Sequence, residues 1–254
     1  DRCAILLPQL SAVREQIEDL ASAHFPLGFE ANIHINILFN DDADTGSLCI
    51  YINSHDKSVP IPANCILALV TWAKTKGLAR LTIDDAGGPV TIYAPDKPIT
   101  RFGKIAMTPP AGAFLQATAD GEKALQQAVA EIIGDSRRVI DLFAGCGTLS
   151  LGMIDQLAVL CAAEADEAAL TALRNGSEAA GFGGRTHTIK RNLFEAPMLV
   201  EELATYDAAI LDPPRSGAAA QCHFLAKSDI DTIAMVSCNP ASFARDAAIL
   251  ASGG

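Results

Sequence analysis

A cysteine between an expected strand and an expected helix is the residue of this sequence best placed to do chemistry. The apolar run 232–236 ends just before Cys238, and Pro240 suits the first turn of a helix because that turn has no use for the missing N–H. In an open α/β sheet such a junction lies at the ligand crevice, and the positive end of the helix favours a thiolate over a thiol. Cys238 is therefore a candidate nucleophile, with a buried free cysteine as the alternative interpretation.

A glycine turn earlier in the chain could hold a cofactor. An apolar strand that contains Asp141 runs into Gly145-x-Gly147, where the glycines let the backbone come close to a ligand. The acid can accept hydrogen bonds from a cationic or hydroxyl-bearing group. Ser150 occupies the place of the third glycine of a dinucleotide-binding loop, so a pyrophosphate cradle is not expected here.

Three further polar residues follow apolar runs. Glu164 comes about 20 residues after the glycine turn, the spacing of an acid that holds the ribose hydroxyls of an adenosine-containing cofactor. Asn192 could reach an adenine edge, although a turn asparagine is an equal alternative. Asp212 is followed by Pro213 and Pro214, which leave the segment little freedom and can hold the carboxylate where a planar base could meet it.

These residues need a framework that brings them together, and the second half of the chain predicts one. The expected strands are 138–143, 159–163, 186–190, 207–211 and 232–237, and the expected helices are 121–133, 149–157, 167–180, 218–226 and 240–250. Their alternation predicts a doubly wound, mainly parallel sheet. Because the carboxyl ends of parallel strands share one edge, the glycine turn, the acids and Cys238 should meet there. The sequence predicts an α/β, Rossmann-like domain over 111–254.

The first part of the chain predicts a smaller α+β domain over 1–110. The expected elements are strands at 31–39 and 48–52, joined as a hairpin, and helices at 9–24 and 63–76. The first strand alternates strictly, with Asn32, His34 and Asn36 on its polar face, so it should be half buried. Proline and glycine cluster at 108–112 and mark the boundary.

Composition narrows the class of protein. Half of the 254 residues are hydrophobic, which is enough for a sizeable core. Because no run approaches the roughly 18 apolar residues of a membrane span and the start carries no signal region, we expect a cytoplasmic protein with no membrane partner. Seven cysteines without a Cys-x-x-Cys pair predict reduced thiols. The net charge of −11 speaks against a nucleic-acid partner, although a local basic groove can exist on an acidic protein.

Several short segments occur in the order of one known family. They are Phe114-Leu115-Gln116, Asp141-Leu142-Phe143-Ala144-Gly145-Cys146-Gly147, Glu164, Asn192-Leu193, Asp212-Pro213-Pro214-Arg215, Ser237-Cys238-Asn239-Pro240 and Ala244-Arg245-Asp246. Together they resemble the RNA uracil-C5 methyltransferases, which use S-adenosylmethionine to make 5-methyluridine in ribosomal and transfer RNA. The resemblance covers most of the chain and implies a class I methyltransferase fold, with the final strands of the sheet missing from this sequence.

The resemblance also implies roles for individual residues. Cofactor binding is implied for Gln116, Phe143, Gly145, Gly147, Thr148, Glu164, Asn192 and Asp212, and the catalytic centre for Cys238 and Asp212. A thiolate that adds to carbon 6 of uracil turns carbon 5 into a nucleophile, which then attacks the sulfonium methyl group. The implied partner is RNA, ribosomal or transfer, with the target uridine left open. The 1–110 domain could contact RNA through its polar strand face, although a solvated surface is favoured. The oligomeric state is also open, with a monomer favoured.

The sequence departs from the family at both ends, which suggests a piece of a longer protein. Cys3 lies in a segment like the one that holds the last ligand of an iron–sulfur cluster in many members. Because a 4Fe-4S cluster needs four thiolates, we expect it in a longer protein only. The glutamate that serves the family as general base has no counterpart after Cys238, so we expect impaired turnover. Thr118 and Thr148 stand where the family often has asparagine.

Other functions remain as alternatives. An S-adenosylmethionine-dependent enzyme that methylates another base or an exocyclic amine beside an Asp-Pro-Pro motif would need no cysteine. A non-catalytic RNA-binding module would suit the acidic charge and the missing glutamate. A nicotinamide-dependent oxidoreductase is disfavoured because Ser150 replaces the third glycine.

Overall fold

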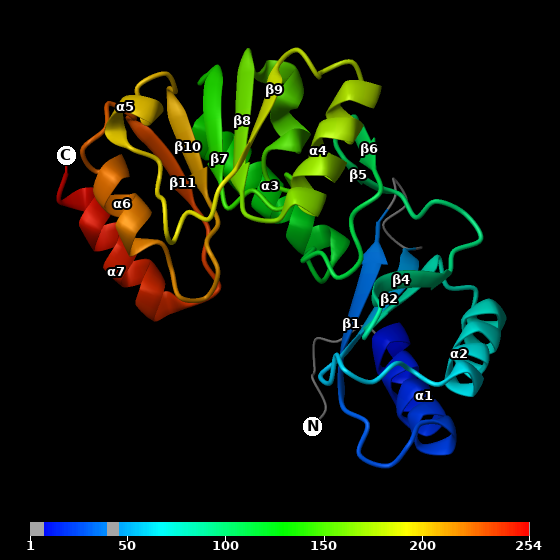
Figure 1. The fold of residues 1–254 in the computed structure, drawn as a ribbon. Helices are drawn as coiled ribbons and strands as arrows, with labels where there is room; N and C mark the ends of the chain where they lie inside the picture. The colour runs from blue at the N-terminus through cyan, green and yellow to red at the C-terminus, as the bar shows by residue number, and fades with distance from the viewer. Residues whose placement is uncertain (1–7, 40–45, 254) are drawn as a thin grey trace. The chain divides into compact units, whose positions relative to one another are not determined.

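The structure, a computed structural model, describes residues 8–39 and 46–253 and consists of two compact units (Figure 1). The first unit ends at Pro98 and the second begins at Ile99. Within the described ranges, no helix is long and apolar enough to cross a membrane. The predicted α/β class is confirmed in the second unit, which holds most of the candidate site residues.

The second unit is built around a five-stranded parallel sheet. Its elements are β5 (Thr100–Phe102), β6 (Ile105–Met107), α3 (Ala119–Ile133), β7 (Arg138–Leu142), the 3-10 helix η1 (Leu151–Gln156), β8 (Val159–Glu164), α4 (Glu167–Ala179), β9 (Thr186–Lys190), α5 (Val200–Leu203), β10 (Ala208–Leu211), α6 (Ala219–Leu225), β11 (Thr232–Met235) and α7 (Pro240–Ala251). Strands β7 to β11 lie close to their expected positions, because short apolar runs bounded by turn residues are typical of buried parallel strands.

The order of the strands defines where a ligand should bind. The sheet runs β11-β10-β7-β8-β9, and every pairing in it is parallel. The chain starts in the centre with β7, builds outward to β9, and then returns to the other side of β7 with β10. Open α/β sheets bind ligands outside the carboxyl ends of their strands at such a reversal. Just past this point, the N–H of Asp212 donates to the carbonyl of Leu142 at 3.4 Å.

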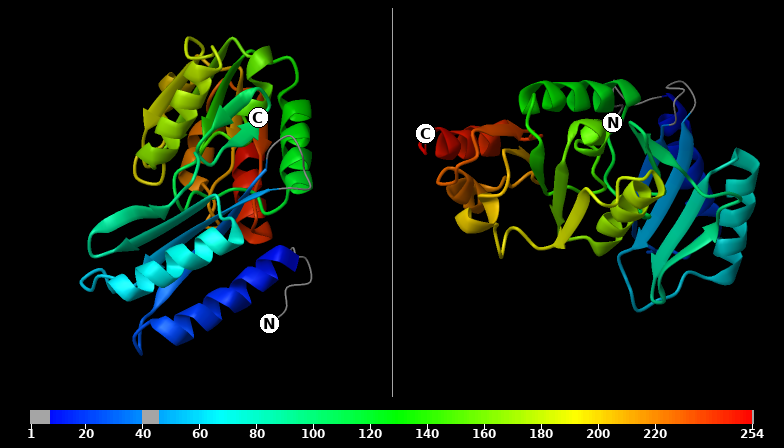
Figure 2. Two further views of the ribbon diagram at one scale, coloured as in Figure 1. Left: turned by 90° about the vertical axis from the view of Figure 1, so that its right-hand side faces the viewer. Right: turned by 90° about the horizontal axis from the view of Figure 1, so that it is seen from above.

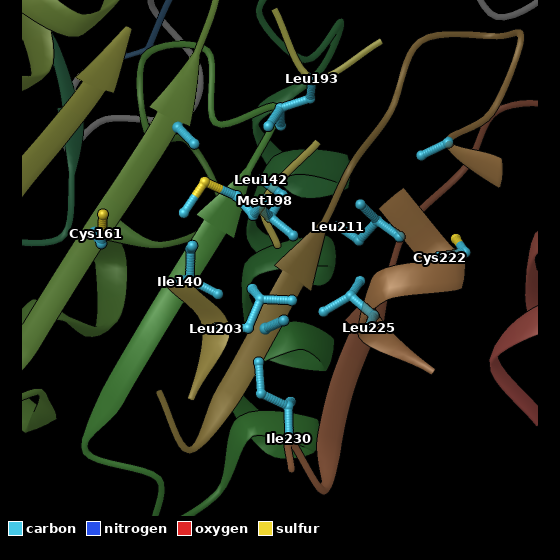
Figure 3. Close-up of a cluster of buried hydrophobic side chains, with 13 residues drawn as sticks. Ile140, Leu142, Cys161, Leu193, Met198, Leu203, Leu211, Cys222, Leu225 and Ile230 are labelled. Atoms are coloured by element: carbon cyan, nitrogen blue, oxygen red, sulfur yellow. The ribbon is translucent and has the colours of Figure 1, made fainter. Parts of the chain in front are cut away.

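Helices cover both faces of this sheet. In the right-hand view of Figure 2, α3 lies along one side of the sheet and α5 and α6 along the other. Ile140 and Leu142 of β7 and Leu211 of β10 belong to a buried cluster with Cys222 and Leu225 of α6 (Figure 3). Because side chains alternate along a strand, the residues between these apolar positions point to the opposite face. The framework around the strand ends is therefore packed from both sides.

The short hairpin of β5 and β6 packs against α4 within the second unit. Phe102 pairs with Ile105 across the hairpin. Gly176 of α4 lies so close to it that a side chain there would begin 3.0 Å from Ile105 Cγ2. This packing explains why the second unit begins before the proline-rich segment at 108–112.

The first unit is a four-stranded mixed sheet. Its elements are α1 (Pro8–His24), β1 (Ala31–Leu38), β2 (Ser47–Ser54), α2 (Ala63–Lys76), β3 (Arg80–Asp85) and β4 (Gly88–Tyr93). The strands lie in the order β1-β2-β3-β4, with β1-β2 and β3-β4 antiparallel and β2-β3 parallel. Ile17 of α1 and Leu69 of α2 share a buried core with Ile50 and Leu81 of the sheet. The predicted hairpin of β1 and β2 is confirmed.

Two local features differ from the expectation. The helix expected at 149–157 is the shorter 3-10 helix η1, in which Leu157 N–H donates to Ile154 O. Gly152 lies inside it and weakens α-helix formation there. In β1, Ile33 is 41% exposed although the alternation placed it on the buried face. The reason is that the first half of this edge strand is largely exposed on both faces.

Candidate active site

The turn after β7 has an unusual backbone. Phe143 has a φ of 61°, the only positive φ of a non-glycine residue in the described part of the chain, and φ is 53° at Gly145 and 79° at Gly147. The N–H groups of Phe143 and Ala144 both donate to the carbonyl of Ala163 in β8, at 3.0 and 3.2 Å. Such a backbone persists only where its surroundings fix it, and it is common at ligand sites.

The two glycines of the turn have different surroundings. No atom lies within 4 Å of the point where a side chain on Gly145 would begin, so this position faces open space. A side chain on Gly147 would begin 2.8 Å from Leu151 Cγ and 2.9 Å from Leu173 Cδ1. The turn is therefore tightly packed on one side and open on the other, which suits a backbone that receives a ligand.

Glu164, at the end of β8, holds the turn through its carboxylate. Its Oε2 accepts the N–H of Gly145 at 3.0 Å, and its Oε1 accepts the N–H groups of Ala165 and Asp166 at 2.6 and 3.0 Å. An ionised carboxylate has about four acceptor positions, so Oε2 can still accept a hydroxyl group. The spacing in the sequence pointed to a ribose, but it gave no sign of the contact with Gly145.

Two buried polar atoms near the turn lack a hydrogen bond of good geometry. Asp141 is 1% exposed, and neither its Oδ2 nor the buried Oγ of Ser150 forms a hydrogen bond within 3.5 Å. Burial, assisted by the charges of Asp212 and Glu164, raises the pKa of Asp141 to about 7, and the Ser150 hydroxyl partly opposes the shift. A cationic or hydrogen-bond-donating ligand would stabilise the ionised form of this carboxyl group.

Asp212 follows β10 at the same edge of the sheet. Its backbone is tied to the end of β7 through the bond to Leu142, while its side chain is only partly exposed and Pro213 behind it is buried. Burial raises the pKa of the Asp212 carboxyl group to about 6. Both protonation states are therefore accessible close to neutral pH, a property that is typical of functional carboxyl groups.

Asn192 and a neighbouring aromatic residue stand at the end of β9. Asn192 is exposed, and its Oδ1 accepts the N–H of Phe194 at 3.1 Å. The ring of Phe194 lies against that of Phe143, with 5.2 Å between the centroids and an angle of 54° between the planes. The Asn192 amide nitrogen stays available as a donor, and the two rings form an apolar surface beside it.

Cys238 is exposed, whereas the other five described cysteines are buried. Strand β11 ends at Met235, and the N–H of Val236 then donates to the carbonyl of Leu211 in β10 at 2.9 Å. Cys238 follows this bond, at the edge of the sheet where β10 gives way to Asp212. The predicted position between a strand and a helix is confirmed.

The helix after Cys238 begins as expected. Asn239 caps α7, because its Oδ1 accepts the N–H of Ala241 at 3.1 Å, and Pro240 occupies the first turn. The Asn239 side chain also donates from Nδ2 to the carbonyl of Arg215 at 3.0 Å. The residue next to the thiol is therefore bonded to the segment that follows Asp212.

The entry to α3 accounts for two residues that differ from the family pattern. The hydroxyl of Thr118 accepts the N–H of Gly121 at 3.1 Å and so caps α3. The carbonyl of Thr148 accepts a bond of 2.8 Å from Gln126 Nε2, which anchors the segment after the glycine turn to α3. Gln116 lies two residues before the cap and is half-buried.

The structure brings most of the predicted site residues to one edge of the sheet. Those that end or follow β7 to β11 at the carboxyl edge are Phe143, Gly145, Gly147, Thr148, Glu164, Asn192, Asp212 and Cys238. Gln116 comes from the segment before α3. Cys3 lies outside the described residues, and within those residues no group of three His, Cys, Asp or Glu side chains could hold a metal ion. The expectation of an iron–sulfur cluster in a longer protein gains no support.

Sequence reasoning missed two residues of this edge and one on α3. Phe194 carried a signal, since an aromatic residue two positions after Asn192 could be expected to face the same ligand. Ser150 was considered only as a missing glycine. Glu122 is buried on α3, where burial raises the pKa of its carboxyl group to about 7, and it lies one helical turn before Gln126 on the same face.

Comparisons with known proteins identify the relatives of this chain. The chain matches no family model. It is 37% identical to an uncharacterized RNA methyltransferase of Mesorhizobium japonicum, in a match that covers 99% of this chain and 58% of that protein. The 23S rRNA (uracil(1939)-C(5))-methyltransferase RlmD of Chromohalobacter salexigens is 37% identical over 145 residues, which cover 56% of this chain and 30% of RlmD. This chain is a homologue of RNA methyltransferases.

The fold of this RNA methyltransferase homologue also has solved counterparts. The Pyrococcus abyssi tRNA (uracil-54, C5)-methyltransferase, solved in complex with S-adenosyl-L-homocysteine, has a TM-score of 0.61 at 17% identity. This likeness covers 82% of the chain and 50% of the Pyrococcus protein, and it confirms the class I methyltransferase fold. The chain spans about half the length of the curated relatives it matches.

Proposed function

We propose that this chain forms the catalytic part of an S-adenosylmethionine-dependent enzyme that methylates carbon 5 of a uridine in ribosomal or transfer RNA. The observation that carries the proposal is the exposed thiol of Cys238 at the carboxyl edge of the sheet, beside the strand that leads to Asp212, while the other described cysteines are buried. Methylation of an exocyclic amine would need no such thiol. Homology to RNA methyltransferases, one of them a uracil-C5 enzyme, supports the same function.

The residues at the carboxyl edge fit S-adenosylmethionine. The open side of Gly145 allows close approach to the backbone, Glu164 keeps an acceptor position for a ribose hydroxyl, and Asp141 Oδ2 is a buried acceptor without a partner. We assign cofactor binding to Gln116, Phe143, Gly145, Gly147, Thr148, Glu164, Asn192 and Asp212. In this assignment the amide of Asn192 and the ring of Phe143 serve the adenine, because one donates hydrogen bonds and the other offers an apolar face.

Cys238 supplies the activation that uracil needs. Its thiolate sulfur forms a bond to carbon 6, and the electron pair of the C5–C6 double bond moves through carbon 4 onto oxygen 4 as an enolate. S-adenosylmethionine, when bound, supplies an electrophilic methyl group to carbon 5 as its own carbon–sulfur bond breaks. A general base then removes the carbon-5 proton, and the electron pair re-forms the double bond and expels the Cys238 thiolate. The target uridine must leave its stack for the sulfur to reach carbon 6.

Asp212 is assigned to holding the target ring. With a pKa of about 6, it can donate a hydrogen bond to a uracil carbonyl when protonated, or accept one from the ring N–H when ionised. Pro213 and Pro214 limit the motion of the segment that carries it. The hydrogen bond from the Asp212 N–H to the Leu142 carbonyl fixes the Asp212 backbone beside the glycine turn.

Replacement of Cys238 by alanine tests the function. The chain is incubated with S-adenosylmethionine and with ribosomal or transfer RNA that contains 5-fluorouridine. Because carbon 5 then carries fluorine in place of the proton that the base removes, the covalent complex persists. We expect Cys238→Ala to form no covalent complex and no 5-methyluridine in unmodified RNA, because the sulfur that bonds to carbon 6 is absent. Its calorimetric affinity for S-adenosylhomocysteine should stay within about twofold of the wild-type value, since the thiol is not assigned to the cofactor.

The matched control is Asp207→Asn, at the opposite edge of the same sheet. Asp207 Oδ2 accepts the N–H groups of Arg137 and Arg138 and lies far along the chain from the thiol. Methylation of an exocyclic amine by Cys238→Ala would refute the uracil mechanism in favour of an amine methyltransferase. A wild-type chain that binds RNA but not S-adenosylhomocysteine would instead be a non-catalytic binding module.

A further inference from the structure

The loop that follows Asp212 is bonded to one face of α7. The carbonyl of Arg215 accepts hydrogen bonds from Asn239 Nδ2 at 3.0 Å and from Ser242 Oγ at 3.1 Å. One position further along the loop, the carbonyl of Ser216 accepts a bond of 2.9 Å from Arg245 Nη2. Residues 239, 242 and 245 are three apart and therefore lie along one side of the helix. Loop 215–218 is held by this side of α7 rather than by a strand or a helix of its own.

Asp246 completes this contact with a buried carboxylate. Its side chain is 0% exposed, and its Oδ2 accepts the N–H of Ala218 at 2.6 Å. Its Oδ1 accepts from Arg245 Nε at 2.8 Å and lies 2.7 Å from Arg245 Nη2. A buried charge persists only with such partners, because leaving water is costly for an ion. Asp246 thus joins the helix to the loop through the Ala218 N–H, and its ion pair with Arg245 orients the guanidinium that bonds to the Ser216 carbonyl.

The backbone of the loop is shaped to approach this carboxylate. Gly217 is buried with a φ of 79°, and a side chain there would overlap Asp246 Oδ2 and Arg245 Nη2. Only glycine combines this conformation with the absence of a side chain. The absence of a side chain at Gly217 therefore lets the loop backbone lie directly against Asp246.

The contact joins the two segments that follow Asp212 and Cys238, the residues assigned to the catalytic centre. The loop begins directly after Asp212-Pro213-Pro214, and Cys238 is followed by Asn239, the N-cap of α7. The bond from the Val236 N–H to the Leu211 carbonyl is the last backbone bond between these two segments in the described residues. Past that point they are joined by the bonds between loop 215–218 and α7, and by the packing of α7 against α6.

We propose that Asp246 is a positioning residue, whose carboxylate fixes the start of α7 against loop 215–218 and thereby sets the place of the Cys238 sulfur relative to Asp212. This inference rests on the proposed function, since it concerns the approach of that sulfur to carbon 6 of a uracil ring. It gives a role to the Arg245-Asp246 pair, which the cofactor and base contacts leave without one. A misplacement of about 1 Å at a reacting atom can cost about 100-fold in rate.

Three variants separate positioning from folding. Asp246→Asn keeps the size of the side chain and removes its charge, Ser242→Ala removes one bond to Arg215 without burying a charge, and Asp207→Asn is the control at the far edge. Each is mixed with S-adenosylmethionine and saturating 5-fluorouridine RNA, and the rate of the covalent complex is measured beside RNA affinity, S-adenosylhomocysteine affinity and thermal unfolding. These binding measurements would fall together with the rate if Asp246 served the fold alone.

We expect Asp246→Asn to slow complex formation by about 30-fold and Ser242→Ala by about threefold, with both affinities within about twofold of wild type. Rates equal to that of Asp207→Asn would overturn the positioning role, as would a parallel loss of cofactor affinity. Should Asp246→Asn fail to fold, Ser242→Ala decides between the same two outcomes. A wild-type chain that forms no complex at all would refute the proposed function itself, which is a different result from equal rates in all folded variants.

Discussion

The amino and carboxyl edges of the five-stranded sheet differ in how their acidic side chains are paired. At the amino edge, Asp207 is exposed and accepts two backbone N–H groups, from Arg137 at 3.0 Å and Arg138 at 2.9 Å. At the carboxyl edge, Asp141 is buried with an unpartnered oxygen, and Asp212 is partly buried with a raised pKa. Both edges belong to the same strands and the same core.

The difference shows which edge the fold keeps for a ligand. Buried polar groups are almost always hydrogen-bonded in folded proteins, and exceptions gather where another molecule is meant to bind. The amino edge satisfies its acid with the chain's own backbone. The carboxyl edge pairs Glu164 with backbone N–H groups but leaves Asp141 Oδ2 without a hydrogen bond, and the exposed thiol stands at this edge too. Five substitutions, grouped in order of decreasing effect, test how far this contrast holds.

The largest effect should come from filling the packed side of the glycine turn. Gly147→Ala places a methyl group against Leu151 and Leu173 at a φ of 79°, so we expect a loss of about 3 kcal/mol in the free energy of unfolding. Gly145→Ala faces open space and should lose about 1 kcal/mol. Urea denaturation measures both, and equal losses would show that the turn has no open side. Gly145→Ala should nevertheless weaken S-adenosylhomocysteine binding more than its small loss of stability suggests.

Neutralising the buried acid should stabilise the protein in a pH-dependent way. The pKa of Asp141 is about 7 in the folded chain and about 4 when unfolded, so its ionisation opposes folding above neutral pH. We expect Asp141→Asn to gain about 2 kcal/mol in unfolding free energy at about pH 8, less than the full shift because the amide also lacks partners. The gain should shrink as the pH falls from 7 towards 4, because Asp141 of the wild type is then increasingly protonated in the unfolded chain as well as in the folded chain. A gain that is independent of pH would show that the carboxyl group is paired.

Removing one charge from the rim of the turn should affect binding more than stability. Glu164→Gln keeps one oxygen acceptor but loses the charge that holds the N–H groups of Gly145, Ala165 and Asp166. We expect a fall of about tenfold in affinity for S-adenosylhomocysteine, measured by calorimetry, because one oxygen can no longer serve both the ribose and the N–H groups of the turn. Unchanged affinity would place the cofactor elsewhere.

The smallest effect is expected at the amino edge. Asp207→Asn weakens two exposed hydrogen bonds and should cost about 1 kcal/mol in unfolding free energy, measured by thermal denaturation. Its affinity for S-adenosylhomocysteine should not change. A loss of binding in this variant would mean that the two edges are coupled, and the contrast between them would no longer mark the site.

The sequence predicted the elements whose signals are local. Strands β7 to β11 were found because each is an apolar run with turn residues at its ends, and α2 was placed at Ala63–Lys76 with Gly77 in left-handed conformation at its end. Strands β3 to β6 were missed. Strand β3 pairs in parallel with β2 across the whole of α2, and such a long-range pairing leaves no local mark in the chain. Strand β4 is largely exposed and begins with Gly88 and Pro89, and β5 and β6 have 3 residues each, too few for alternation to show.

The candidate site divides in the same way. Its residue types and their order followed from motifs, so Glu164, Asp212 and Cys238 could be named in advance. The motifs could not predict which groups meet in space. Examples are the hydrogen bond from Gly145 to Glu164, the Asp141 oxygen that has no hydrogen bond, and the ring contact between Phe143 and Phe194. These depend on how strands distant in sequence are set side by side.

Every strand of the five-stranded sheet contributes a group to the same edge, from Phe143 after β7 to Cys238 after β11. A cofactor held by the assigned residues would contact groups that follow β7, β8, β9 and β10 at once, so local opening of any of these strands would require it to dissociate first. Amide hydrogen exchange should therefore slow along these four strands when S-adenosylhomocysteine is added, and not only at the residues in contact with it.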